Sequence, residues 1–394
     1  TTTEYNGKAA LFESASYSYY ILSETPSYYK EATVNADGSL SFSEVKGATA
    51  QKLSDASIDF TTDTKYGDYE LDGEVIKEWK KGTAYSQGDK VLYNGKIWQA
   101  SWWTQGDTPG DKIWIGPQQK EKAAKIFPVV LPMLREVLEK SPAKRAVITV
   151  CGGSGVGKTG ISSLLTYYFN QLGIGCYTLS GDNYPRRIPS LNDAERMRIF
   201  RLAGIRGMLG QNVYTPDAAR ELKALQEAET DSASKEADRY SWLTVYQKAG
   251  RKALAEYLGS EQEFDELSKT LTQFKSGADK IWLKRMGRTE TELWYEEKDF
   301  RNISVIILEW THGNCGKFDG VDIPILLNST PAETREYRLL RARDANTDTP
   351  FIAMVLEIEQ GMLENRAHAA KIILSKSGDF LTYEQFKRQM DAGR

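Results

Sequence analysis

Residues 146–159 of this 394-residue chain read AVITVCGGSGVGKT, an apolar run that passes directly into a glycine-rich turn. The first six residues are rich in valine and isoleucine, which predicts a buried strand. The last eight match the pattern G-x-x-x-x-G-K-[ST] at every position, and the apolar positions from Ile161 to Phe169 predict a helix after them. A strand, a loop of this pattern and a helix, in that order, indicate a phosphate-binding loop.

Each residue type in this loop has a chemical reason to be there. Glycines let the backbone curl around phosphate oxygens with its N–H groups pointing inward, and the following helix aims its positive end at the same anion. We expect Lys158 to reach the β- and γ-phosphates of ATP and the Thr159 hydroxyl to help hold Mg²⁺. The predicted cofactors are therefore ATP and Mg²⁺, and the predicted nucleotide-binding residues are Gly152, Gly153, Ser154, Gly155, Val156, Gly157, Lys158 and Thr159.

Outward from this loop, apolar runs alternate with helical stretches, which is typical of an α/β parallel sheet flanked by helices. Further strands are predicted at residues 176–179, 305–308, 324–327 and 372–374. A charged helix is predicted over residues 118–140, with its regular part starting near Met133 because Pro128 and Pro132 interrupt the first half. Residues 193–290 are charged and almost wholly helical, which predicts a helical insertion within a domain spanning residues 118–394.

The second predicted strand ends in the residues SGDNY, from Ser180 to Tyr184. A strand-end Asp followed closely by an aromatic residue resembles the uridine kinase and phosphoribulokinase group of P-loop small-molecule kinases. The resemblance implies that Asp182 takes the proton of the acceptor hydroxyl and that Tyr184 contacts the acceptor. Parallel sheets hold ligands at the carboxyl ends of their strands, which suits Asp182, although an Asp-Asn turn without catalytic role is the alternative.

The resemblance continues at Glu309, which follows the strand at residues 305–308. In the family a carboxylate at this position lies near the Mg²⁺ and the acceptor, so the resemblance implies both roles for Glu309. Trp310 departs from the family pattern, which has a small residue there. His312 is either a substrate contact or an exposed loop residue.

An arginine-rich run at residues 338–344, RLLRARD, resembles the lid signature of the same family. The resemblance implies that Arg341 and Arg343 act in catalysis and that Arg338 contacts the nucleotide, where guanidinium groups neutralise phosphate charge. The same spacing also suits an exposed helix.

Basic residues near the predicted acceptor pocket favour an acceptor that already carries an anion; they are Arg186, Arg187, Arg285 and Arg288. The expected function is transfer of the γ-phosphate of Mg-ATP to a hydroxyl of a small acceptor such as a nucleoside, sugar or sugar phosphate. Three alternatives stay open: an adenylylsulfate kinase, a protein that uses ATP as a conformational switch, and a carbohydrate-attachment protein with a degenerate kinase domain. The helical insertion is a candidate for a homodimer face or a substrate lid.

Residues 76–117 form an aromatic cassette with a hairpin signal at Asn94-Gly95. The order of its tryptophans, tyrosines and glycines resembles the small chitin-binding modules of bacterial glycosidases, which implies binding of a chitin-like glycan. Sugar rings stack on exposed aromatic faces. We expect Tyr85, Trp102 and Trp103 to contact sugar, and Trp79, Trp98 and Trp114 to pack inside. Residues 1–75 predict a small β module of open role, with strands at residues 17–22 and 39–42.

Composition excludes several classes of protein. A net charge of −3 gives no reason to expect a nucleic-acid partner. No apolar run approaches the roughly 18 residues of a membrane span, and three scattered cysteines do not make a disulfide framework. The need for ATP predicts a cytoplasmic location, although chitin-binding modules usually occur on secreted proteins. The chain begins with Thr1 rather than Met, which leaves an upstream segment such as a signal peptide open.

Overall fold

The computed structural model describes most of the chain from residue 117 onward and shorter stretches before it. The described ranges are 2–5, 9–13, 19–23, 29–34, 40–42, 69–71, 74–81, 83–85, 89–93, 96–100, 104–105, 108–109, 117–287, 289–335 and 349–392.

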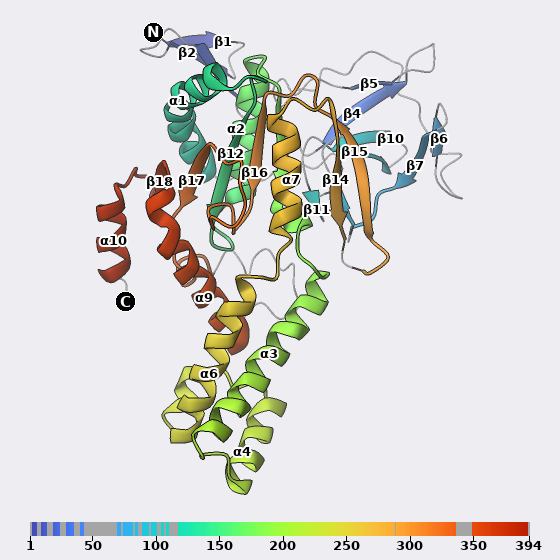
Figure 1. Ribbon diagram of the computed structural model, residues 1–394. Coiled ribbons are helices and arrows are strands. Elements are labelled where there is room, and N and C mark those ends of the chain that lie inside the picture. The colour runs from blue at the N-terminus through green and yellow to red at the C-terminus, as the bar shows by residue number, and fades with distance from the viewer. Residues whose placement is uncertain are drawn as a thin grey trace.

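A five-stranded parallel sheet forms the centre of the larger domain (Figure 1). Its strands, in spatial order, are β13 (Cys176–Ser180), β16 (Val305–Glu309), β12 (Ala146–Gly152), β17 (Ile323–Leu327) and β18 (Ile372–Leu374). Every residue of β12, β13 and β16 is buried, as expected for a parallel sheet covered on both faces. The predicted α/β class and all five predicted strands are confirmed.

Helices cover both faces of this sheet (Figure 1). On one face α1 (Pro117–Lys140) and α2 (Lys158–Gln171) share a core with residues such as Ile148 and Ile307. On the other, α7 (Phe264–Lys275) packs against Leu179 and Leu308, and α10 (Tyr383–Ala392) packs near Leu326. The α2 helix is therefore held against the sheet directly behind the phosphate loop.

The helix α1 corrects one expectation from the sequence. It is continuous from Pro117 and carries Pro128 and Pro132 inside it, so its regular part does not start near Met133. Ile126, Phe127 and Val130 are fully buried around these prolines. Burial of this apolar face outweighs the backbone hydrogen bonds that the two prolines remove.

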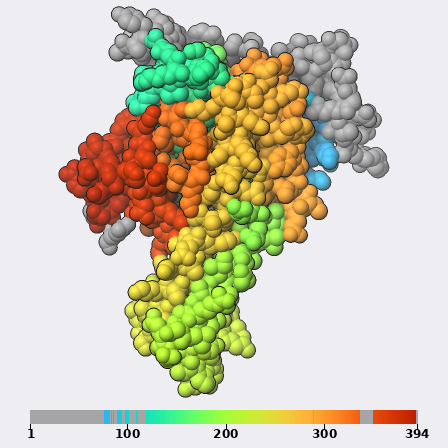
Figure 2. All heavy atoms as spheres, viewed as in Figure 1, coloured from blue at the N-terminus to red at the C-terminus, as the bar shows by residue number. Residues whose placement is uncertain are grey.

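The helical insertion extends away from the sheet as a separate lobe (Figures 1 and 2). It comprises α3 (Pro189–Gly210), α4 (Pro216–Glu227), α5 (Ser234–Ala237) and α6 (Ser241–Leu258). A helix from far along the chain, α9 (Pro350–Arg366), contributes Phe351, Met354 and Val355 to the core of this lobe. The lobe is thus attached to the sheet domain from both ends.

The prediction of helix as far as residue 290 is wrong at its end. After α7 the chain forms an antiparallel hairpin of β14 (Lys280–Met286) and β15 (Leu293–Asp299). The alternation of Ile281, Leu283 and Arg285 on the buried face of β14 has the period of a strand.

The described residues before α1 form three sheets. One holds β1 (Thr2–Tyr5), β2 (Ala9–Glu13) and β3 (Tyr19–Ser23), and another pairs β8 (Ala84–Tyr85) with β11 (Thr104–Gln105). The third has the order β5 (Leu40–Phe42), β4 (Tyr29–Val34), β10 (Lys96–Ala100), β9 (Lys90–Tyr93), β7 (Glu74–Glu78) and β6 (Tyr69–Leu71). Tyr93 pairs with Lys96, as the predicted hairpin requires. Because β4 pairs with β10, this sheet crosses the boundary predicted at residues 75–76.

In the described part of the chain, none of the helices is both long enough and apolar enough to cross a bilayer.

Candidate active site

The phosphate loop connects the last residue of β12 to the first residue of α2. Gly155 and Gly157 have φ angles of 82° and 95°, a backbone conformation that favours glycine. At Gly152 a Cβ would lie 2.5 Å from the carbonyl oxygen of Leu327, so the neighbouring strand also requires glycine. Gly157 caps α2 without a side-chain hydrogen bond, which leaves the first N–H groups of the helix directed at the loop. This geometry suits an anion.

The two polar side chains at the start of α2 lie where the sequence motif requires them. The Lys158 ammonium donates to the carbonyl oxygens of Gly152 and Gly153, each at 3.0 Å, so its charge stays at the mouth of the loop. The Thr159 hydroxyl donates to Oε1 of Glu309 at 3.4 Å. A hydroxyl beside a carboxylate is a donor set that Mg²⁺ accepts, and these are the two residues predicted to hold it.

Glu309 and Asp182 lie at the ends of adjacent strands. In the sheet register Glu309 stands opposite Val150 of β12 and Ser180 of β13, and its side chain is buried. Asp182 follows two residues after Ser180 in the short 3₁₀ turn η1 (Gly181–Asn183), and it is exposed. The Ser180 hydroxyl accepts from the Asp182 N–H at 3.3 Å, which fixes the turn.

Trp310 packs against the turn that carries Asp182. Its side chain is 2% exposed and packs against Phe264 and Phe318. A Cβ at Gly181 would lie 2.0 Å from Cγ of Trp310, so the tryptophan fits only because residue 181 is glycine. The departure from the family pattern at position 310 is therefore matched by a small residue beside Asp182.

Two predicted acceptor contacts lie away from the site, which corrects the expectation. Tyr184 is completely buried in the core between the sheet and α7. Arg285 is also buried, and its guanidinium donates to Glu296 at 2.9 Å and to the Tyr177 hydroxyl at 2.8 Å. Both side chains therefore stabilise packing instead of facing the loop.

Arg186 and Arg187 are exposed and contact the end of α6 and the segment that follows it. Arg186 donates to the Ser260 carbonyl oxygen at 3.1 Å, and Arg187 donates to the Tyr257 hydroxyl at 3.0 Å. These contacts hold the chain after Asp182 against the helical lobe.

Several predicted site residues lie outside the described part of the chain, and their roles stay predictions. They are Arg288, the lid arginines Arg338, Arg341 and Arg343, and Trp102 and Trp103 of the aromatic cassette; Trp114, predicted to pack inside, also lies outside the described residues.

In the aromatic cassette Tyr85 differs from its expectation. Its ring is 9% exposed and packs with Val91 and Ala100, while its hydroxyl accepts from the Lys80 N–H at 2.7 Å. Trp79 and Trp98 pack against the same cluster, as predicted. A buried ring has little face left for a sugar, so Tyr85 belongs to the core of the cassette.

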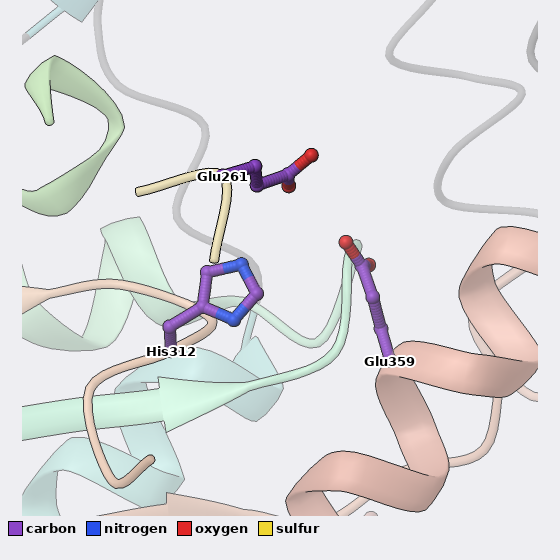
Figure 3. Close-up of side chains that lie close together, drawn as sticks. All are labelled: Glu261, His312 and Glu359. Atoms are coloured by element: carbon purple, nitrogen blue, oxygen red, sulfur yellow. The ribbon is translucent and has the colours of Figure 1, made fainter. Parts of the chain in front are cut away.

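Four polar side chains near the loop were not identified as a group from the sequence. Arg196 of α3 binds both carboxylate oxygens of Glu261, and its guanidinium lies 3.8 Å from Oε1 of Glu359 on α9. Glu261, His312 and Glu359 each place one polar atom within 4.8 Å of the others (Figure 3). We call Arg196, Glu261, His312 and Glu359 the polar cluster.

Burial shifts the titration of two members of this cluster. Loss of contact with water lowers the pKa of His312 to about 4 and raises the pKa of Glu359. The charges of Lys158 and Asp182 also act on both groups, which puts the cluster within electrostatic reach of the phosphate loop. The imidazole is therefore neutral at pH 7.

Two members of the cluster had a signal in the sequence: His312, a candidate substrate contact, and Glu359. Glu359 lies four residues after the buried Val355 on α9, so it occupies an apolar face of a helix where a charge is unusual. No local pattern connects Arg196 with Glu261, because 65 residues separate them and only the fold brings them together.

The strand–loop–helix unit, the parallel sheet and the strand-end carboxylates define a P-loop nucleotide-binding domain. Residues 78–115 match carbohydrate-binding module family 5/12, which confirms the resemblance predicted for the aromatic cassette. A 48-residue stretch is 40% identical to chitinase A of Pseudoalteromonas piscicida and covers 12% of this chain and 6% of that protein.

The larger domain has a kinase among its relatives. The chain is 40% identical over 243 residues to the bifunctional alpha-galactosidase/sucrose kinase AgaSK of Mediterraneibacter gnavus, covering 61% of this chain and 21% of that protein. The chain thus spans about a fifth of the length of this relative. Since α1 begins at Pro117, more than half of the 243 aligned residues lie from α1 onward. This relative confirms the predicted resemblance to small-molecule kinases.

Among solved structures, D-glycerate 3-kinase from Cryptococcus neoformans aligns with a TM-score of 0.40 and 11% identity over 66% of this chain and 97% of that one. A TM-score this low carries no argument about function.

Proposed function

We propose that this protein is an ATP-dependent phosphotransferase that moves the γ-phosphate of Mg-ATP to a hydroxyl of a small acceptor. The observation that carries the proposal is the meeting of three features at one edge of the sheet. They are the phosphate loop with Lys158, the Thr159–Glu309 pair, and Asp182 at the end of the neighbouring strand.

Each of these groups has a distinct task in the proposed reaction. The loop N–H groups and the start of α2 hold the phosphates, and Lys158 stabilises negative charge on the β- and γ-phosphates. Thr159 and Glu309 would hold Mg²⁺, which supplies positive charge to the transferred phosphoryl group when bound. The exposed Asp182 carboxylate accepts the proton of the attacking hydroxyl. The lid arginines Arg338, Arg341 and Arg343 would neutralise the phosphates from the other side.

A sugar is the acceptor class that we propose. Support comes from the sucrose kinase relative, and sucrose is accordingly the first acceptor to test. Residues 78–115 would add binding of a chitin-like glycan through exposed aromatic rings. The requirement for ATP favours a cytoplasmic location, and the helical lobe remains a candidate dimer face or lid.

The test is label transfer from γ-labelled ATP with Mg²⁺ to a panel of sugars, sugar phosphates, nucleosides and adenylylsulfate. The wild-type chain is compared with Lys158→Ala, Asp182→Asn and, as a matched control, Lys223→Ala on the exposed surface of α4. We expect one acceptor to be labelled by the wild type and the control and by neither active-site variant. Full transfer by Asp182→Asn would remove Asp182 as the base. Binding of ATP with slow hydrolysis and no labelled acceptor would favour a nucleotide switch instead.

A further inference from the structure

The polar cluster is assembled from four segments that are distant in sequence. Arg196 comes from α3, Glu261 from the segment between α6 and α7, His312 from the loop after β16, and Glu359 from α9. Figure 3 shows Glu261, His312 and Glu359 around one shared space. The helical lobe and the sheet domain both contribute to it.

The backbone positions this cluster beside the proposed reaction centre. Arg186 N–H donates to the Glu261 carbonyl at 2.9 Å, and Glu263 N–H donates to the Tyr184 carbonyl at 2.8 Å. The segment that carries Glu261 is therefore attached directly to the residues after Asp182. On the opposite side, Glu359 lines a small cavity together with Gly153 and Ser154 of the phosphate loop.

The charges of the cluster disfavour an anionic acceptor. Its positive group is the Arg196 guanidinium, its imidazole is neutral at pH 7, and Glu261 and Glu359 add carboxyl groups, so the cluster has little positive charge to attract a phosphate or carboxylate on the acceptor. The guanidinium of Arg196 is already engaged by Glu261, and that of Arg285 by Glu296. These arginines are not available to balance another negative charge.

The same groups suit a molecule with several neutral hydroxyls. A sugar hydroxyl can donate to a carboxylate or to an imidazole nitrogen and accept from a guanidinium at the same time. The side chain of Glu359 is 15% exposed, and among the described residues the basic group within 4 Å of its carboxylate is that of Arg196, at 3.8 Å and so beyond hydrogen-bond distance. Its oxygens can therefore accept hydrogen bonds from a ligand.

A metal ion is the other occupant that two carboxylates and a histidine could hold. Both oxygens of Glu261 bind Arg196, which uses one lone pair on each and places a positive charge beside the space. A divalent cation would be repelled by that guanidinium, so the geometry favours a polyol.

We infer that the polar cluster binds the phosphate acceptor and selects a neutral polyhydroxyl molecule, a sugar without phosphate or carboxylate. Glu359 and His312 are its direct contacts, and Arg196 holds Glu261 in position. This inference rests on the proposed function for the identity of the site as an acceptor site, and it replaces the anionic acceptor predicted from Arg186, Arg187, Arg285 and Arg288.

The test is calorimetry of acceptor binding to the whole chain in the presence of Mg²⁺ and an ATP analogue that cannot transfer its phosphate. The probes are sucrose, fructose and fructose 6-phosphate, and Mg²⁺ and Zn²⁺ are titrated alone. The variants are Glu359→Gln and His312→Gln, with Glu357→Gln as the matched control because Glu357 is on the same helix, exposed and paired with Arg251. Thermal melting of each variant shows that it is folded.

We expect a neutral sugar to bind, and Glu359→Gln to weaken its Kd by about tenfold or more while the Kd of the ATP analogue changes by less than about twofold. Three results would overturn the inference: tighter binding of fructose 6-phosphate than of either neutral sugar, unchanged sugar affinity in both variants, or stoichiometric metal binding that Glu359→Gln abolishes. Because binding is read without turnover, it is separate from the proposed function. A sugar that binds but is never labelled from γ-labelled ATP would contradict only the phosphotransfer.

Discussion

The phosphate loop and the polar cluster are neighbours, since Glu359 lines a small cavity with Gly153 and Ser154, but they are encoded in opposite ways. The loop occupies eight consecutive residues whose backbone conformation and charge follow from local residue types. The cluster needs residues 196, 261, 312 and 359, which become neighbours only when the helical lobe and α9 pack together. Nucleotide binding can therefore be predicted from a motif, whereas acceptor selection depends on tertiary structure.

The largest expected effect falls on the loop. Lys158→Ala removes the positive charge that stabilises the transferred phosphoryl group, and we expect kcat to fall by roughly a hundred- to a thousandfold. The acceptor Kd should stay nearly unchanged, because Lys158 contributes to the polar cluster only through long-range charge. Steady-state kinetics together with acceptor calorimetry checks both. An equal loss in acceptor affinity would mean that the two regions are not separable.

A second expected effect concerns the turn η1, which carries Asp182. Gly181→Ala would place a Cβ 2.0 Å from Cγ of Trp310, which cannot move freely in its packed site. We expect overpacking to lower the free energy of unfolding by about 1–3 kcal/mol and to displace Asp182, with a loss of kcat.

Urea unfolding of Gly181→Ala, Trp310→Leu and the double variant tests this pairing. The double variant should lose less stability than the sum of the two single changes, because the shorter side chain removes the clash. Strict additivity would show that Trp310 does not determine the glycine.

The third expected effect is a pH dependence that originates in the cluster. The folded protein lowers the pKa of His312 to about 4, whereas an unfolded chain has the ordinary value near 6.5. As pH falls from 6.5 to 4 the unfolded state therefore takes up a proton before the folded state, and His312 lowers the stability of the fold in this window.

His312→Gln should reduce this loss of stability, as measured by urea unfolding at pH 7, 6, 5 and 4. His368→Gln serves as the matched control. If the stability of His312→Gln fell with pH as steeply as that of the wild type, the effect would come from other groups.

The smallest expected effect has the opposite sign for stability and for binding. Burial raises the pKa of Glu359, so the folded state favours the protonated form and loses stability as pH rises from the ordinary carboxyl value through the raised one. Glu359→Gln should therefore raise the melting temperature at pH 7 to 8, with a difference that shrinks toward pH 4, although it weakens sugar binding. A lower melting temperature at pH 8 would contradict this account of a stability sacrificed for function.

The parts of the fold that were predicted correctly have strong local signals. β12, β16, β17 and β18 are short runs with β-branched residues, buried on both faces. Thr159 and Glu309 lie close together because β12, which leads into the phosphate loop, pairs with β16, which ends at Glu309. The wrong predictions arise where burial in the core outweighs the local sequence signal. α1 stays helical through Pro128 because its apolar face is buried, and Tyr184 turns into the core instead of following the family pattern.

Arginines were the least predictable residues. Arg285 looked like a ligand for an anion but is buried and paired with Glu296, whereas Arg196 had no distinguishing context and proves central to the cluster. The charge of an arginine is visible in a sequence, but its partner is set by the fold. For this reason the partners of these arginines could not be inferred from the sequence.

The most direct test of the central claim is a competition within a single turnover. The whole chain is mixed with one equivalent of γ-labelled ATP and Mg²⁺ and then with equal concentrations of a neutral sugar and its phosphorylated counterpart, sucrose with sucrose 6-phosphate in the first instance. We predict that the label appears in a sucrose monophosphate, the product of the neutral sugar, and that Lys158→Ala produces none. Label in a sucrose bisphosphate, the product of the phosphorylated competitor, or label released only as inorganic phosphate, would contradict the account.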